Sequence, residues 1–365
     1  MEEVLYVLGP VSSLLVWRAA SRGVVDMPVR DGHQPDLRRS YARVRDLRTF
    51  STVRALGDAI LDVIVGSASR THYCPSLEMM VLRGTLPQDS FCWVENGLYV
   101  CSPELCLVLL GRGGCTLHLV ELACELCGTY SIAHDQSGSF VNRPQLLSCD
   151  RMCEYLDALG PCHGCAAARK AIALAADGSD SPRETSMFLS FTLPSSMGGF
   201  GFPKPTLNGR IELSRESQKA LGKSYLVPDE VYRDADGHIL AIAEYDGKQY
   251  HLLTSDADGE GMTIDVGKVL SDDQRREVIR DEGIDLVSVR TEDTLDFERF
   301  EQKAMRLGRL LGIEVSSQSG RLLSRRASLF ARLFDTKRWH DEHALLARLA
   351  GYRREIHHRA PLDDV

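Results

Sequence analysis

The stretch "YLVPDEVYRDADGHILAIAEYDGKQYH", residues 225–251, decides the fold predicted for the second half of the chain. Two β-rich runs flank Asp236-Gly237, and an Asp-Gly pair between such runs is a strong signal for a tight hairpin turn. With those two residues as the whole loop, Asp229 faces Glu244 across the two strands. The Cβ atoms of facing residues lie about 5 Å apart, so the predicted pairing brings two carboxylates together.

Two facing carboxylates at this position predict a cation. The run "ILAIA", residues 239–243, is apolar at both parities, as in a strand covered on both faces, so Glu244 ends a core strand. Buried facing carboxylates must either take up protons or bind a cation. Mg²⁺ fits because it prefers oxygen ligands and binds through one or two carboxylates while keeping several waters. The alternative is a longer loop, which shifts the register and sends one acid to solvent.

Further helices and strands are predicted on both sides of the hairpin. A helix-start signature begins at Ser181, with Pro182 in the first turn and Glu184 placed as in a capping box. Glu184 therefore has an alternative role as a capping acid. The other flanking segments read as a strand at 206–213, a helix at 271–283 and a strand at 284–290. The order of helix, three strands, helix and strand predicts an α/β layer with helices on a mixed sheet.

This order of elements, with "PDE" (228–230) on one strand and "EYDG" (244–247) on the next, resembles the PD-(D/E)XK nuclease superfamily. Within it, the chain is similar to very-short-patch-repair-like endonuclease domains, which show "EYDG..YH" followed by an Asp and an Arg on the next helix. The resemblance covers about residues 180–312. It implies a restriction-endonuclease-like mixed sheet that hydrolyses phosphodiester bonds of DNA with Mg²⁺ or Mn²⁺.

The resemblance also implies roles for individual residues. Asp229 and Glu244 would be metal ligands, and Glu184 would match the helix-borne acid of many members. The family's lysine, two residues after the second acid, is replaced by Asp246, which would line the site. A basic group would then come from one of four candidates: Lys248, His251, Arg275 and Arg276. The alternatives are an exposed turn for the lysine, a rim position for the histidine and a solvated helix face for the arginines.

The 365 residues are enough for two domains, and a polar, turn-rich link at 175–182 marks the predicted boundary. We expect an accessory α/β domain at 1–178, the nuclease-like domain at 179–315 and a basic amphipathic helical tail at 316–365. The first domain would bind substrate or a protein partner. Its segments "LYVCSPE" (98–104) and "ELCGTY" (125–130) resemble segments that accompany the nuclease-like module in related proteins, and similar amino-terminal regions occur in abortive-infection antitoxin-like proteins. The tail either packs as helices with solvated arginines or lines a nucleic-acid groove.

Composition limits the environment and the partners. A net charge of −8 argues against DNA binding over the whole surface, although a local basic surface remains compatible with it. The apolar stretches are too short to span a bilayer, and the first residues lack the basic region of a secretion signal. We therefore expect a cytoplasmic protein with DNA as its partner and no membrane partner.

Eleven cysteines in a reducing compartment predict free thiols or metal ligands before disulfides. Two pairs, "CELC" (124–127) and "CHGC" (162–165), have a spacing that a zinc site could use. The first pair reads as part of a helix, where a buried cysteine behaves as a small hydrophobe. Structural zinc is therefore not favoured.

Three functions remain open at this point. The first is a metal-dependent DNA endonuclease, of a kind used in phage defence or mobile-element biology. The second is a nuclease fold without catalysis that binds DNA or protein as an antitoxin or regulator, which the missing lysine and the acidic composition favour. A zinc-stapled scaffold without nucleic-acid function is a third reading. Cleavage assays and metal analysis distinguish the three.

Overall fold

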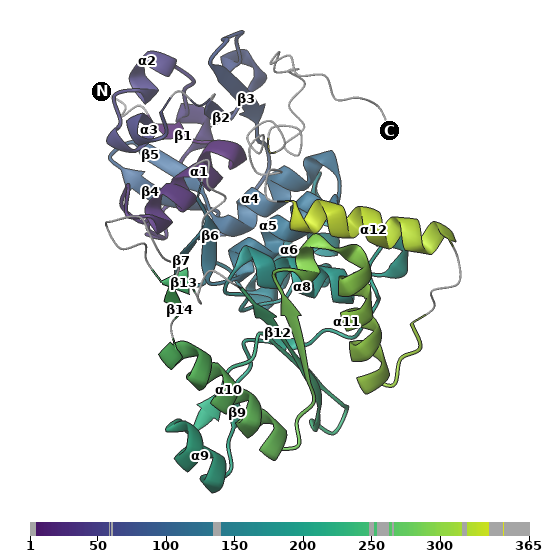
Figure 1. Cartoon of the computed structure of the whole chain (residues 1–365). Helices are drawn as coiled ribbons and strands as arrows, with labels where there is room; N and C mark the ends of the chain where they lie inside the picture. The colour runs from purple at the N-terminus through teal and green to yellow at the C-terminus, as the bar shows by residue number, and fades with distance from the viewer. Residues whose placement is uncertain are drawn as a thin grey trace. The chain divides into compact units, whose positions relative to one another are not determined.

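The computed structural model describes residues 5–57, 59, 61–133, 140–247, 252–253, 263–264, 266–315, 320–335 and 346. Of residues 252–253, 263–264 and 266–272 it describes the backbone alone. The chain divides into two compact units, Met1–Ala175 with Lys337–Val365, and Ala176–Thr336 (Figure 1). Both units mix helices and strands, so the protein is α/β. No helix among the described residues has the length and apolar character needed to cross a membrane.

The first unit contains, within the described residues, a three-stranded sheet of order β1-β5-β4 and the two-stranded sheets β2-β3 and β6-β7. β1 runs parallel to β5, and β2 runs parallel to β3. The strands are β1 (Tyr6–Val7), β2 (Leu61–Val65), β3 (Leu77–Val81), β4 (Phe91–Glu95), β5 (Leu98–Cys101), β6 (Tyr130–Ile132) and β7 (Phe140–Asn142). The helices are α1 (Pro10–Ser21), α2 (Val44–Leu47), α3 (Ser51–Ala55), α4 (Pro103–Leu110), α5 (Leu117–Cys127), α6 (Cys149–Leu159) and α7 (Cys165–Leu174).

A residue distant in sequence caps the buried helix α1. The Asp62 carboxylate accepts from the backbone N–H groups of Val11 (3.0 Å) and Ser12 (2.7 Å). A Cβ on Gly9 would lie 2.4 Å from an Asp62 oxygen, so only glycine permits this approach. Further along α1, the buried Arg18 forms a bidentate pair with Glu125 of α5, at 2.9 and 2.5 Å. These contacts fix α1 between β2 and α5.

The second unit is built on a four-stranded sheet of order β15-β12-β11-β8 in the described part of the chain. β12 and β15 are parallel, and β11 is antiparallel to both β12 and β8. The strands are β8 (Thr206–Leu207), β9 (Ile211–Glu212), β10 (Tyr225–Leu226), β11 (Glu230–Arg233), β12 (Ile239–Asp246), β13 (Leu252–Leu253), β14 (Thr263–Ile264) and β15 (Leu286–Arg290). The helices are α8 (Pro182–Thr192), α9 (Arg215–Leu221), α10 (Val266–Asp281), α11 (Phe297–Leu310) and α12 (Gly320–Phe334).

Helices cover both faces of this sheet. On one face, Val278 and Ile279 of α10 pack on Val231 and Ile242. Helices α8 and α11 contact β12 on the side away from α10 (Figure 1). An aromatic cluster joins the helices α8, α11 and α12, with Phe300 at its centre. Helix α12 therefore belongs to the second unit, which agrees with the packed-helix alternative for this part of the tail.

The run 206–213 is two strands, where the sequence predicts one. Between β8 and β9 the chain turns at Asn208, whose φ of 47° lies in the left-handed region. β9 then pairs with β10 outside the four-stranded sheet. The elements α8, β8, β11, β12, α10 and β15 occur in the predicted order, but β9, α9 and β10 lie between β8 and β11, and β13 and β14 lie between β12 and α10.

The strand register near the acids is the predicted one. Glu230 pairs with Ala243, and the two following pairs continue inward in the same register. Continuing outward by one residue sets Asp229 opposite Glu244. The hairpin thus brings together the two acids that the sequence singles out.

The predicted two-residue turn is wrong. The Asp234 N–H donates to the carbonyl of His238 (2.9 Å), so residues 235–237 form a three-residue loop. A bulge follows, because Arg233 pairs with Ile239 while the next pairs revert to the predicted register. The bulge absorbs the extra loop residue, which leaves the register of the acids unchanged.

Candidate functional site

Four acids lie near the ends of β11 and β12: Glu184, Asp229, Glu244 and Asp246. Asp229 immediately precedes β11, and its Oδ2 accepts a hydrogen bond from the backbone N–H of Tyr245 in β12 (2.6 Å). The Asp229 carboxylate therefore reaches across to the strand that carries Glu244. The pKa of Asp229 is raised well above its usual value by burial and by the negative charges of Glu184 and Glu244. The hydrogen bond from Tyr245 and the charge of Arg275 offset this only in part.

Glu184 has the capping role that the sequence offers as an alternative, and it also lies beside Asp229. Its N–H donates to the Ser181 hydroxyl oxygen (3.2 Å), and its carboxylate accepts from the N–H of Asp180 (2.8 Å). Burial raises the pKa of Glu184 despite these hydrogen bonds. Since Glu184 in turn raises the pKa of Asp229, one side chain both caps α8 and adds negative charge to the site.

Asn208 links these two acids and is a residue that the sequence reading missed. Its side-chain amide donates to Glu184 Oε2 (3.0 Å), and its backbone N–H donates to the carbonyl of Asp229 (3.0 Å). The "LNG" segment at 207–209 predicts a turn at Asn208, but nothing in the sequence predicts that its side chain contacts the acids.

Two consecutive arginines of α10 reach the acids of β12. Arg275 donates to the Glu244 carboxylate, and Arg276 Nη2 donates to Asp246 Oδ2 (3.0 Å). Arg276 also contacts Asp273 on its own helix (3.3 Å). The solvated-face alternative therefore fails for both arginines, and the structure brings together Asp229, Glu244, Asp246, Arg275 and Arg276 as the sequence predicts.

The carboxylates of Glu184, Asp229 and Glu244 are not close enough together to contact one metal ion as they stand. Among the described residues, Asp234, Asp236 and His238 have ligand atoms that all lie within 4.8 Å of one another. The other such group contains Cys127 and Cys149. Glu184, Asp229 and Glu244 do not form such a group. The guanidinium of Arg275 instead contacts Glu244, and in the described part of the chain no basic side chain is bonded to Asp229 or Glu184.

The ligand atoms of Asp234, Asp236 and His238 lie close enough together to hold a cation, and these residues also close the hairpin turn. Asp234 Oδ1 accepts from the N–H groups of Asp236 (2.9 Å) and His238 (2.8 Å), and the His238 ring lies 3.1 Å from Asp234 Oδ2. These bonds close the hairpin loop. The arrangement is that of an exposed turn in which the Asp234 carboxylate accepts hydrogen bonds from the backbone of the turn itself.

Glu230 was part of the quoted motif but received no predicted role. It is completely buried on the sheet face opposite to Asp229, and the Tyr232 hydroxyl donates to its Oε2 (2.6 Å). Its Oε1 has no hydrogen-bond partner among the described residues. Burial raises the pKa of Glu230 to about 8. The remaining candidates, Lys248 and His251, lie outside the described residues.

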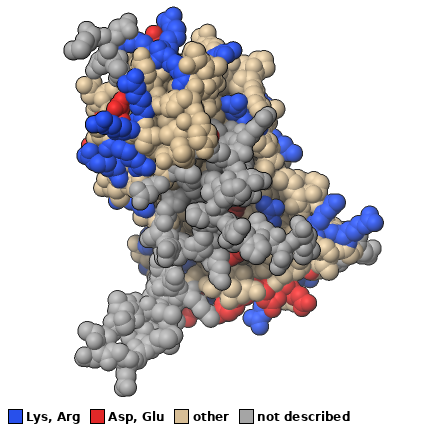
Figure 2. Space-filling view, turned by 90° about the horizontal axis from the view of Figure 1, so that it is seen from above, with Lys and Arg blue, Asp and Glu red and all other residues tan. Residues whose placement is uncertain are grey.

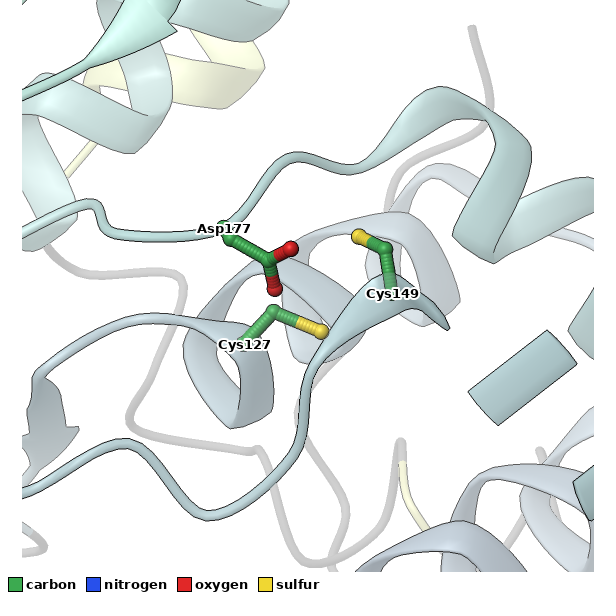
Figure 3. A group of neighbouring side chains, drawn as sticks. All are labelled: Cys127, Cys149 and Asp177. Atoms are coloured by element: carbon green, nitrogen blue, oxygen red, sulfur yellow. The ribbon is translucent and has the colours of Figure 1, made fainter. Parts of the chain in front are cut away.

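The cysteines differ in part from expectation. Cys162 and Cys165 form a disulfide with Cα atoms 5.4 Å apart, so the expected preference for free thiols or metal ligands is wrong for "CHGC". In the first unit, Cys127 ends α5 and Cys149 begins α6 (Figure 3). The Asp177 drawn with them belongs to the second unit. Within the first unit this group is two thiols, fewer than the four ligands of a structural zinc site.

The second unit therefore offers a cluster of acids at adjacent strand ends, only partly neutralised by arginines. Carboxylate oxygens are the donors that hold Mg²⁺ or Mn²⁺ in proteins. Asp229 and Glu244, from neighbouring strands, and Glu184, from α8, could supply such oxygens. Comparison of the chain with family models, curated proteins and solved structures finds no match.

Proposed function

We propose that the second unit is a PD-(D/E)XK-type endonuclease that hydrolyses phosphodiester bonds of DNA with Mg²⁺ or Mn²⁺. The observation that carries the proposal is the position of Asp229. One residue beyond the pair of Glu230 with Ala243, the strand register sets it opposite Glu244, and burial together with two neighbouring carboxylates raises its pKa. A folded protein tolerates such like charges where a cation or a functional constraint requires them.

Each residue of the cluster has a chemical role in this proposal. A bound divalent cation would lower the pKa of a water and neutralise charge on the scissile phosphate. Asp229 and Glu244 would hold it, and Glu184 would stay fixed by its cap and by Asn208. Asp246 would orient Arg276.

Arg275 would stand in for the absent lysine. Its guanidinium already lies at Glu244, beside the predicted metal position, and on leaving Glu244 it could face a phosphate oxygen. A guanidinium stays protonated at any working pH. Arg275 would therefore stabilise negative charge and would not act as a general base.

DNA cleavage tests the proposal directly. Purified full-length protein is incubated with nicked, mismatched and single-stranded DNA in Mg²⁺ or Mn²⁺. We expect cleavage that EDTA stops and that Asp229→Asn and Glu244→Gln abolish. Asp236→Asn, an exposed acid of the hairpin loop, is the matched control and should cleave like the wild type. Cleavage that survives Asp229→Asn would refute the assignment.

A second function, DNA or protein binding without catalysis, is favoured by the ion pairs of Arg275 and Arg276. These pairs already neutralise two of the four acids, so the cluster has a stable arrangement without metal. Absence of cleavage together with DNA binding that persists in EDTA would favour this function. Because such binding weakens steeply with salt, a salt titration identifies it.

A further inference from the structure

The first unit carries a dense run of arginines that the sequence reading passed over. Residues 37–54, "LRRSYARVRDLRTFSTVR", contain six arginines, no lysine and a single acid, Asp46. The chain as a whole has 51 acids and 43 Lys and Arg residues. Positive charge is therefore concentrated here against an acidic background.

The fold holds this run on the edge of the parallel pair β2-β3. The Gly66 N–H, directly after β2, donates to the carbonyl of Leu37 (3.0 Å). A Cβ on Gly66 would lie 2.6 Å from that carbonyl oxygen, so glycine is required for the contact. The following residues form a short 3-10 turn, Leu37–Arg39, and then α2 and α3. The run is thus part of the folded unit and is presented on its surface.

Most of these arginines point to solvent. Arg38, Arg43, Arg45 and Arg54 are exposed, and the side chain of Arg38 is 88% exposed. Arg48 differs, because its guanidinium donates to backbone carbonyls nearby and is structural. In Figure 2, Lys and Arg side chains gather on one part of the surface with few acidic side chains among them.

Two guanidinium groups share one aromatic ring within this surface. Arg70 lies 4.3 Å and Arg43 lies 5.4 Å from the ring centroid of Tyr41. Arg70 is held there by a hydrogen bond from its Nη1 to the Ser40 carbonyl (3.1 Å). The ring attracts each cation but leaves two like charges close together. An anion bound at this point would relieve their repulsion.

Nearby acids neutralise only part of the run, because Asp36 forms an ion pair with Arg38 (3.0 Å). Asp46 accepts from the Tyr6 hydroxyl at 2.7 Å and lies only at 4.0 Å from Arg43. Among the described residues, no carboxylate lies within ion-pair distance of Arg45, Arg54 or Arg70. The surface therefore keeps an excess of fixed positive charge.

We propose that this arginine face, composed of Arg38, Arg39, Arg43, Arg45, Arg54 and Arg70, binds the phosphate backbone of nucleic acid. Guanidinium groups match phosphate oxygens in a bidentate geometry, which suits a surface made of arginine without lysine. A single small anion could contact only part of a face spread over several elements, whereas a polyanion engages all of it. Tyr73, 82% exposed and three residues after Arg70, adds an aromatic ring for stacking on a base.

The binding is independent of catalysis in the second unit, so the test removes catalysis. Fluorescence anisotropy of a short labelled DNA duplex is measured with the full-length protein in EDTA, in a Glu244→Gln background, over a range of KCl concentrations. The test variant is Arg43→Gln/Arg45→Gln/Arg54→Gln. The matched control, Arg215→Gln/Arg306→Gln/Arg309→Gln, removes three exposed arginines from the second unit. Far-UV circular dichroism verifies that both variants fold.

We expect the test variant to bind roughly tenfold or more weakly at moderate salt, with a slope of log Kd against log salt shallower by about one per arginine removed. The control should bind like its parent. Equal binding by both variants would overturn the proposal. So would an arginine-dependent interaction with anionic phospholipid vesicles in place of DNA. Loss of DNA cleavage alone would leave this result unaffected, so the two proposals fail separately.

Discussion

Arg275 and Arg276, consecutive residues of α10, donate to Glu244 and Asp246, which lie two residues apart on β12. Residues two apart in a strand point to the same face, so one turn of the helix meets one face of the strand. This relationship gives each acid its own counter-charge. Among the described residues Asp229, opposite Glu244, has no basic side chain bonded to it, and burial and the neighbouring carboxylates raise its pKa.

The pairing with Arg275 predicts competition between the arginine and a metal ion. Arg275→Gln removes the cation from Glu244, so Mn²⁺ should bind about tenfold more tightly, a gain of about 1.4 kcal/mol. Isothermal titration calorimetry with Mn²⁺ measures this. Arg280→Gln, an exposed arginine of the same helix, should leave the affinity unchanged. Equal Mn²⁺ affinity of the wild type, Arg275→Gln and Arg280→Gln would show that Arg275 does not compete with a metal ion for Glu244.

The Asp229 carboxylate should lower the Tm of the protein when no metal is bound and raise it when metal is bound. Asp229→Asn relieves the repulsion with Glu184 and Glu244, so we expect a higher Tm than the wild type in EDTA. Mn²⁺ should raise the Tm of the wild type and not that of the variant, because a ligand stabilises the state that binds it. Differential scanning fluorimetry measures both. Identical Mn²⁺ shifts in the two proteins would contradict the role of Asp229 as a ligand.

Glu230 predicts a defined dependence of stability on pH. Its pKa is raised from 4.5 to about 8, so the folded state binds a proton that the unfolded state releases between these values. The free energy of unfolding should therefore fall as pH rises from about 4.5 to about 8, by about 1.4 kcal/mol per pH unit at most. In Glu230→Gln this part of the slope should disappear.

Urea unfolding at several pH values measures the effect of Glu230. Glu277→Gln, an exposed acid of α10, is the control and should keep the slope of the wild type. A Glu230→Gln variant that loses stability with pH as steeply as the wild type would mean that Glu230 is ionised in the folded protein.

The buried pair of Arg18 and Glu125 predicts a large stability effect in the first unit. Arg18→Met leaves the Glu125 carboxylate buried without its cation, which should lower the free energy of unfolding by about 3–5 kcal/mol. Arg18→Met/Glu125→Gln should recover part of this loss, because the uncompensated charge is removed. Urea unfolding of the two variants compares them, and equal stability of both would contradict the argument.

The sequence predicted the parts of the second unit that local patterns determine. The cap at Ser181, the helix carrying Arg275 and the register between Glu230 and Ala243 follow from caps, turn residues and alternation. The predicted loop length was wrong by one residue. A bulge near Arg233 absorbs the extra residue, and a bulge has no simple signal in the sequence.

Other features depend on tertiary packing and could not be read from the sequence. Helix α12 joins the second unit through the contact of Phe330 with Phe300, a pairing between distant residues. The approach of Arg70 to Tyr41 likewise becomes visible only once Gly66 has docked on Leu37. The sequence is compatible both with ion pairs between α10 and β12 and with a solvated helix face, and only the packing of α10 on the sheet distinguishes them.

Anomalous diffraction from crystals soaked in Mn²⁺ tests the central claim most directly. The account predicts a peak within about 2.2 Å of carboxylate oxygens from both Asp229 and Glu244, with the Arg275 guanidinium moved away from Glu244. Crystals in which Arg275 stays on Glu244, with no peak beside Asp229 at saturating Mn²⁺, would contradict it.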